Sequence, residues 1–158
     1  MNKILKLFTI FLSCSLFLSC GYKVVNKMNK NDYSISEITT TGAPRISFII
    51  KNRLLYTSSK ESKNIFNLSI NTNKKRIVKN KNIKNEVTDY ELVIDTQVKY
   101  TLLGEIGETK FSINKSGSYK VSDQRINTIN NEKRLLETLT NNIINQIIAR
   151  LNKKINDN

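Results

Sequence analysis

The order of the predicted elements places this chain in the α+β class, as a mixed four-stranded sheet with two helices on one face and the order β-α-β-β-β-α. Two observations carry this prediction. Residues 90–102 alternate between apolar and polar side chains, which indicates a strand. Residues 130–154 repeat apolar side chains every three or four positions, which indicates a helix.

The first two elements are a short strand and a helix. Apolar and polar residues alternate over 33–38, and Gly42 breaks the chain after this strand. Pro44 suits the first residue of a helix, where the missing N–H costs nothing, so we expect a helix over 44–58. The segment 47–50 would also suit a buried strand, because periodicity over so few residues does not distinguish the two.

Three further strands are expected to form a meander. Residues 65–72 alternate and form the first of them. The long strand over 90–102 has one apolar face, and its polar face is expected to meet water or a polar partner. A turn over 104–107 leads to a strand over 111–121, in which Ser116-Gly117 predicts a bulge or bend.

The final element is a helix over 130–154, with Asn130 as its N-cap and Glu132 in its first turn. Its apolar side chains form one ridge at four-residue spacing with a second row beside it. We expect this stripe to cover the sheet rather than to require a membrane or a partner helix. The stripe comprises Leu135, Leu136, Leu139, Ile143, Ile144, Ile147, Ile148 and Leu151.

The N-terminal segment resembles the signal peptide of a bacterial lipoprotein. An uncharged run over 7–18 follows two lysines and is too short to span a bilayer. The quartet Phe17-Leu18-Ser19-Cys20 resembles a lipobox, in which cleavage precedes the lipidated cysteine. We therefore expect a signal peptide over 1–19, a lipidated tether over 20–32 and a single domain over 33–155.

Two alternatives to this reading of the N-terminus remain. The same four residues end at Cys14, but cleavage there would leave an apolar run over only 7–13. The segment could also be an ordinary secretory signal in which Cys20 is a chance residue. If Cys20 is lipidated, it carries an N-acyl group and an S-diacylglycerol group, and no other cofactor is expected.

Composition argues against an enzyme. The chain has no histidine, so the commonest general base and neutral metal ligand are missing. Cys14 leaves with the signal and Cys20 is consumed by lipid, so the mature chain is left without a disulfide or a reactive thiol. The 13 acidic residues are scattered, which makes carboxylate catalysis the least favoured class.

The charge of the chain favours anionic partners. Removal of residues 1–19 leaves 139 residues with a formal charge of +11. Because an A+T-rich genome also raises the lysine content, clustering is more informative than the total. Six basic residues and no acid occur within 74–84, namely Lys74, Lys75, Arg76, Lys79, Lys81 and Lys84.

This basic run has several possible structures and partners. It would form either a hairpin tip or a twisted extension of the preceding strand, and such runs are often solvated loops. No aromatic residue occurs within it, which argues against single-stranded nucleic acid as a partner. We therefore expect no nucleic-acid binding.

Four short segments together resemble the LPS-assembly lipoprotein family, LptE. They are Cys20-Gly21-Tyr22, Pro44 with Lys51-Asn52-Arg53-Leu54, Tyr90-Glu91-Leu92-Val93-Ile94, and Asn130-Asn131-Glu132. The resemblance implies an outer-membrane lipoprotein that plugs and stabilises the LptD-type β-barrel and binds lipopolysaccharide. Gly21, rather than Asp, after the lipidated cysteine is compatible with delivery to the outer membrane.

The resemblance also implies basic ligand positions before the long strand and near the last helix. Lys79, Lys81 and Lys84 occupy the first region, where we expect contacts to phosphate or anionic saccharide. Arg125 precedes the predicted last helix and is a fourth candidate. The polar face of the long strand, with the turn over 104–107, is expected to contact the barrel. The alternative function is a lipid-anchored periplasmic module for another anionic ligand or envelope machine.

Overall fold

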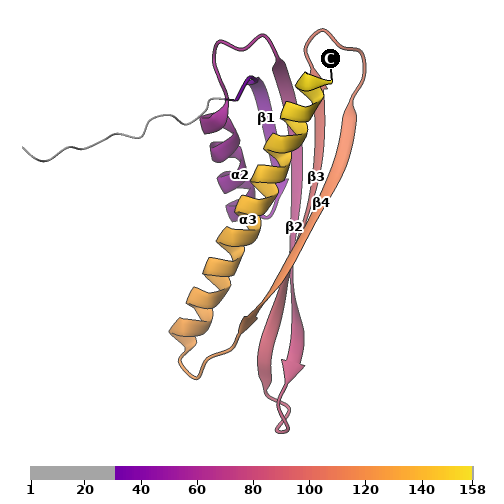
Figure 1. Cartoon of the computed structure of the whole chain (residues 1–158). Helices are drawn as coiled ribbons and strands as arrows, with labels where there is room; N and C mark the ends of the chain where they lie inside the picture. Colours follow the sequence, from indigo (N-terminus) through magenta and orange to yellow (C-terminus); the bar gives the residue numbers. More distant parts are fainter. Residues whose placement is uncertain (1–30, 158) are drawn as a thin grey trace, which may run out of the picture.

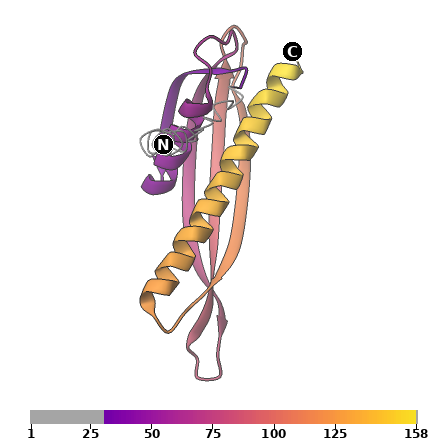
Figure 2. The same ribbon diagram turned by 60° about the vertical axis from the view of Figure 1, so that its left-hand side comes forward.

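Four strands form one mixed sheet, and two helices lie on a single face of it (Figures 1 and 2). The computed structural model describes residues 31–157. Cys20, the predicted signal peptide and most of the predicted tether lie outside the described residues.

The elements follow the predicted order. β1 pairs in parallel with β2, and β2, β3 and β4 form an antiparallel meander. This arrangement confirms the α+β class and the mixed sheet. The bounds are β1 (Ser34–Gly42), α2 (Pro44–Thr57), β2 (Ile65–Lys81), β3 (Val87–Leu102), β4 (Thr109–Lys120) and α3 (Arg125–Asn156).

The hydrophobic core lies between the helices and the sheet. Every second side chain of β2 and β3 faces the helices, and the apolar stripe of α3 covers them, as the sequence predicted. Leu135 and Ile148 are partly buried at the margin of this stripe. Among the described residues, no helix has the length and apolar character needed to cross a membrane. The largest fully buried core side chains include Tyr33, Phe66, Ile50, Leu54, Leu92, Ile94, Ile143 and Ile147.

The first helix begins at Pro44, as predicted, which excludes the strand alternative for 47–50. The first strand is longer than the predicted 33–38, because it continues to Gly42. The three threonines over 39–41 are β-branched and pair in register with β2, which extends the strand.

Five of the six cations of the basic run lie in an extension of β2, and Lys84 lies in the loop at the hairpin tip. β2 continues to Lys81, well beyond the predicted end at residue 72, and β3 begins at Val87 instead of residue 90. Both strands lengthen because they pair with each other over this region. The loop at the tip of the hairpin is confined to 82–86.

The predicted bulge in the fourth strand is absent. β3 and β4 pair without a register shift through Ser116 and Gly117. Gly117 serves packing instead, because a Cβ atom there would lie 2.8 Å from Leu135 Cδ1. The register shifts of the meander lie on either side of Asn80, where first Lys79 of β2 and then Thr88 of β3 lacks a partner in the ladder.

The last helix begins earlier than predicted, at Arg125. Asn130 therefore lies inside α3 and is not its N-cap, and Glu132 is not in the first turn. The cap residue is Gln124, which makes no side-chain capping bond. Two hydrogen bonds between Thr128 Oγ1 and the backbone of Ser122, at 2.8 and 3.3 Å, stabilise the earlier start.

Gly42 sets the point where β1 leaves the sheet. Its φ is +89°, and a Cβ atom there would lie 1.8 Å from the Thr72 carbonyl oxygen. Only glycine permits this close approach of the two strands. The next residues, Ala43 and Pro44, start α2, so β2 continues alone on this side.

We expect Gly42→Ala to lower the free energy of unfolding by at least about 2 kcal/mol, since it adds backbone strain to a steric clash. Urea unfolding would measure the change. Gly104→Ala is the matched control, because Gly104 has φ +92° with no atom within 4 Å of an added Cβ. The control should lose only about 1 kcal/mol, and equal losses in both variants would contradict the role of the close approach.

Candidate anion-binding site

The second half of β2 contributes no side chain to the hydrophobic core. Side chains of β2 alternate between buried and exposed as far as Thr72, whereas all those over 73–81 are exposed. β4 accompanies β3 only as far as Asp89. The basic residues therefore lie on an exposed projection of the sheet, which we call the basic extension (residues 73–84).

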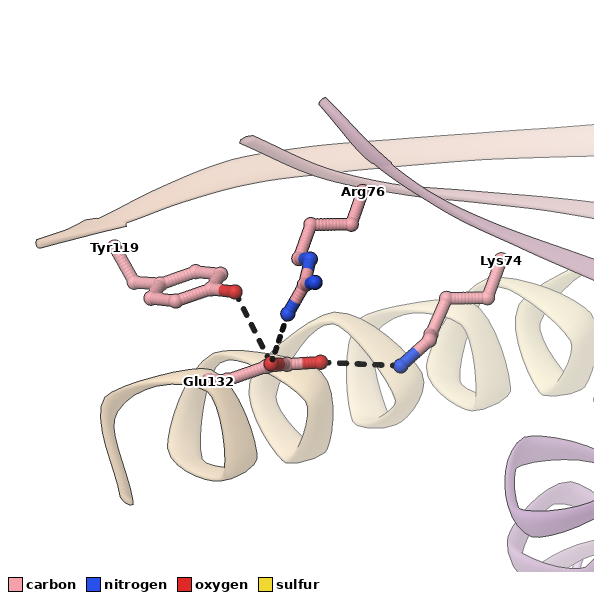
Figure 3. A network of polar contacts seen from close by, with 4 residues as sticks. All are labelled: Lys74, Arg76, Tyr119 and Glu132. Carbon is pink, nitrogen blue, oxygen red and sulfur yellow. Dashed lines mark hydrogen bonds and ion pairs between the residues drawn. The ribbon is translucent and has the colours of Figure 1, made fainter. Parts of the chain in front are cut away.

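Glu132 of α3 fixes the base of the basic extension to the helix (Figure 3). Its carboxylate accepts hydrogen bonds from Lys74 Nζ at 3.1 Å and from Tyr119 OH at 3.0 Å. Arg76 Nη1 lies 3.6 Å from Glu132 Oε2, and its guanidinium lies over the ring of Tyr90, 4.8 Å from the centroid. One carboxylate thus ties β2 and β4 to α3.

The network favours the ionised form of Glu132. Burial alone would raise the pKa of Glu132, but hydrogen bonds from Lys74 and Tyr119 and the charges of Lys74 and Arg76 outweigh it. The pKa of Glu132 therefore lies below its ordinary value of 4.5. Burial, followed by the hydrogen bond to Glu132, raises the pKa of Tyr119, which keeps this phenol protonated as a donor.

The three predicted lysines lie together at the far end of the basic extension. Lys79 Nζ donates to Ser118 Oγ at 2.6 Å, and Lys81 Nζ donates to Asn85 Oδ1 at 2.9 Å. Both acceptors are neutral. Lys79 also acts on a nearby acid, because hydrogen bonds from Thr88 and Asn80, and then the charges of Lys120 and Lys79, lower the pKa of Asp89. Lys84 lies in the loop at the tip and is exposed. This group of cations is suited to phosphate or carboxylate oxygens.

Arg125 does not belong to this group. It is the first residue of α3 and is exposed. Both views show the start of α3 apart from the hairpin tip (Figures 1 and 2). The structure thus brings three of the four candidate residues together and separates the fourth.

A crevice of about 380 Å³ lies beside the Glu132 network, between α3 and the start of α2. It combines cationic and apolar side chains, which is the chemistry that an anionic amphiphile requires. Within residues 31–157, no cluster of three or more potential metal-ligating side chains occurs. The crevice lining includes Arg45, Lys74, Lys133, Ile46, Ile129 and Leu136.

Sequence reasoning missed the network and the crevice. Glu132 and Lys74 are 58 positions apart, so only the tertiary fold brings them together. One signal was available in the sequence. Lys74 and Arg76 are two positions apart, and in a strand that spacing directs both to the same face.

The comparisons with known proteins identify the fold. No protein-family model and no curated protein sequence gives a significant match to this chain. A solved protein from Caulobacter crescentus CB15, provisionally described as a lipoprotein, matches with a TM-score of 0.56 and 18% identity over 76% of this chain and 90% of that chain. This chain shares the fold of that protein.

Two other solved lipoproteins match less closely. Rare lipoprotein B from Shewanella oneidensis has a TM-score of 0.48 and 15% identity over 77% of this chain and 94% of its own. Uncharacterized lipoprotein B from Nitrosomonas europaea has a TM-score of 0.42 and 12% identity over 76% of this chain and 84% of its own. The fold assignment rests only on the match to the protein from Caulobacter crescentus CB15, and at 18% identity that match shows nothing about the site.

We expect Glu132→Gln to lower the free energy of unfolding at pH 7 by about 1 to 2 kcal/mol, because the charged acceptor of Lys74 and Arg76 is lost. Since the pKa of Glu132 is lowered in the folded state, its contribution is fully present above pH 4.5 and is lost as the pH falls further. Urea unfolding of both proteins between pH 3 and pH 7 would measure this. A difference that grows as the pH falls would contradict the network.

Proposed function

We propose that this chain is an outer-membrane lipoprotein that plugs and stabilises an LptD-type β-barrel and binds lipopolysaccharide. The lipidated residue would be Cys20, with N-acyl and S-diacylglycerol groups. Neither catalysis nor a further cofactor belongs to this proposal.

The basic extension is the observation that supports ligand binding. Lys79 and Lys81 donate hydrogen bonds to neutral oxygens, and Lys84 is exposed in the loop at the tip. Lipid A and inner-core sugars carry phosphates and carboxylates that such cations can pair with. The crevice beside Glu132 adds apolar surface within reach of Lys74, which suits the acyl portion of the same ligand.

The placement of the chain's ends supports an anchored molecule that presents its cations away from the anchor. Asn31, where the described chain begins, bonds to Thr57 at the end of α2 and to Asn152 near the end of α3. This end of the molecule is opposite the hairpin tip (Figure 1). At about 3.3 Å per residue, β2 alone separates the two ends by roughly 50 Å.

We expect the triple change of Lys79, Lys81 and Lys84 to Gln to weaken lipopolysaccharide binding by about tenfold or more at physiological salt, through loss of charge-assisted hydrogen bonds. Binding of purified lipopolysaccharide to the detergent-solubilised protein would be measured by calorimetry.

The matched control changes Lys60, Lys63 and Lys153 to Gln, which removes the same charge from exposed positions near the opposite end. This control should bind almost normally. Equal loss in both triple variants would indicate a diffuse charge effect, and unchanged binding in the first would contradict the proposed site.

We expect the tagged, solubilised protein to copurify with a heat-modifiable β-barrel in stoichiometric amount, visible on gels run with and without heating.

Deletion of 105–107 should reduce this association, since we propose that the turn contacts the barrel. Lys154→Gln is the control, because it removes the 3.0 Å ion pair with Glu105 without shortening the turn. A monomer that recovers no barrel would favour the independent anion-binding module instead.

A further inference from the structure

β2 has an unpaired edge along the basic extension. β1 pairs with β2 only as far as Gly42 opposite Thr72, and then turns away into α2. On the other side, β3 pairs with β2 to the end of the hairpin. In the described part of the chain, no strand pairs with the outer side of 73–81, which we call the free edge.

The backbone groups that this edge presents can be assigned from the ladder. Leu103 N donates to Ile65 O, so the carbonyl of Ile65 points inward, toward β3. Ala43 N donates to Thr72 O, so the carbonyl of Thr72 points to the outer side of β2. Because outward and inward backbone groups alternate along an antiparallel strand, the N–H and C=O groups of Lys74, Arg76 and Val78 point outward. Three successive outward residues are enough to bind an added strand.

The side chains on the free edge select the chemistry of such a strand. Lys75, Ile77 and Lys79 lie on the face of the sheet opposite the helices, since their neighbours Lys74 and Arg76 contact Glu132 on the helix face. Lys79 contacts a neutral hydroxyl, and Ile77 is 48% exposed. A partner strand would therefore place acidic side chains beside the lysines and an apolar side chain beside Ile77.

The same charges disfavour a second copy of this chain as the occupant. Two free edges paired with each other would bring lysines and Arg76 of both copies together, and like charges on adjacent strands are destabilising. An acidic strand gains attraction from the same cations. Charge complementarity thus selects an acidic, extended polypeptide segment.

We propose that the free edge binds an extended acidic segment of a partner protein by β-strand addition. Backbone hydrogen bonds come from Lys74, Arg76 and Val78, and selectivity comes from Lys75 and Lys79. This partner site goes beyond the proposed function, because it uses backbone groups that lipopolysaccharide binding by lysine side chains does not need.

The test uses the full chain in detergent and a capped synthetic peptide, Thr-Glu-Thr-Val-Thr-Glu-Thr, as the probe. Fluorescence anisotropy of the labelled probe measures affinity, and hydrogen exchange of 73–81 measures backbone protection. Val78→Pro removes one outward N–H while leaving the bonds to β3 in place, a position where an edge strand tolerates proline. Val78→Thr keeps the N–H and is the matched control.

We expect the probe to protect 73–81 in the wild type and in Val78→Thr, and to bind Val78→Pro about tenfold more weakly. A probe that is N-methylated at alternate residues should also lose binding, which gives a test that does not depend on the fold of a variant. Equal binding of the methylated probe or of Val78→Pro would show attraction between side chains alone and would overturn the proposal. Absence of binding, or self-association of the chain through 73–81, would overturn it too.

Discussion

The rest of the structure depends on the pairing of β2 with β3, which runs from Phe66 to Lys81 and shifts in register only beside Asn80. The upper part of this ladder is covered by α2 and α3 and supplies the core. Toward the tip this cover ends gradually: β2 has no buried side chain after Thr72, whereas Leu92 and Ile94 of β3 are still buried. The strand pair persists there because β4 pairs with β3 as far as Asp89. A single hairpin therefore joins a stable apolar layer to a polar projection.

Glu132 governs how firmly that projection is held. An isolated strand pair is marginally stable in water, and the residues over 73–81 bury almost no apolar surface. The carboxylate of Glu132 compensates two cations at the base, while the stacking of Arg76 on Tyr90 adds contact across the ladder. Farther along, Lys79 donates a hydrogen bond to the neutral hydroxyl of Ser118. The projection is thus fixed at its base and electropositive toward its tip.

Sequence periodicity predicted the elements whose side chains enter the core. It did not predict the segments whose conformation depends on pairing with another strand or on contacts with a loop. Alternation identified β3, and four-residue spacing identified the stripe of α3, because burial imposes those patterns directly. The second half of β2 carries lysine and asparagine, which have low strand propensity, so its conformation follows from its partner strand rather than its own residues. For the same reason the sequence could group Lys79, Lys81 and Lys84 by proximity, but could not place Arg125 apart from them or bring Glu132 to Lys74.

The two proposed surfaces of the basic extension use different groups of the same residues. A soluble or membrane-bound anion would engage the ammonium groups of Lys79 and Lys81, whereas an added strand would engage outward backbone groups such as those of Val78. Because Lys79 also contributes charge to the free edge, an anion bound there would reduce the attraction for an acidic strand. The two proposed binding events would therefore oppose each other through a shared charge, although they would share no hydrogen bond. By linkage, an acidic partner at the free edge would favour release of an anionic ligand from the lysines to the same degree.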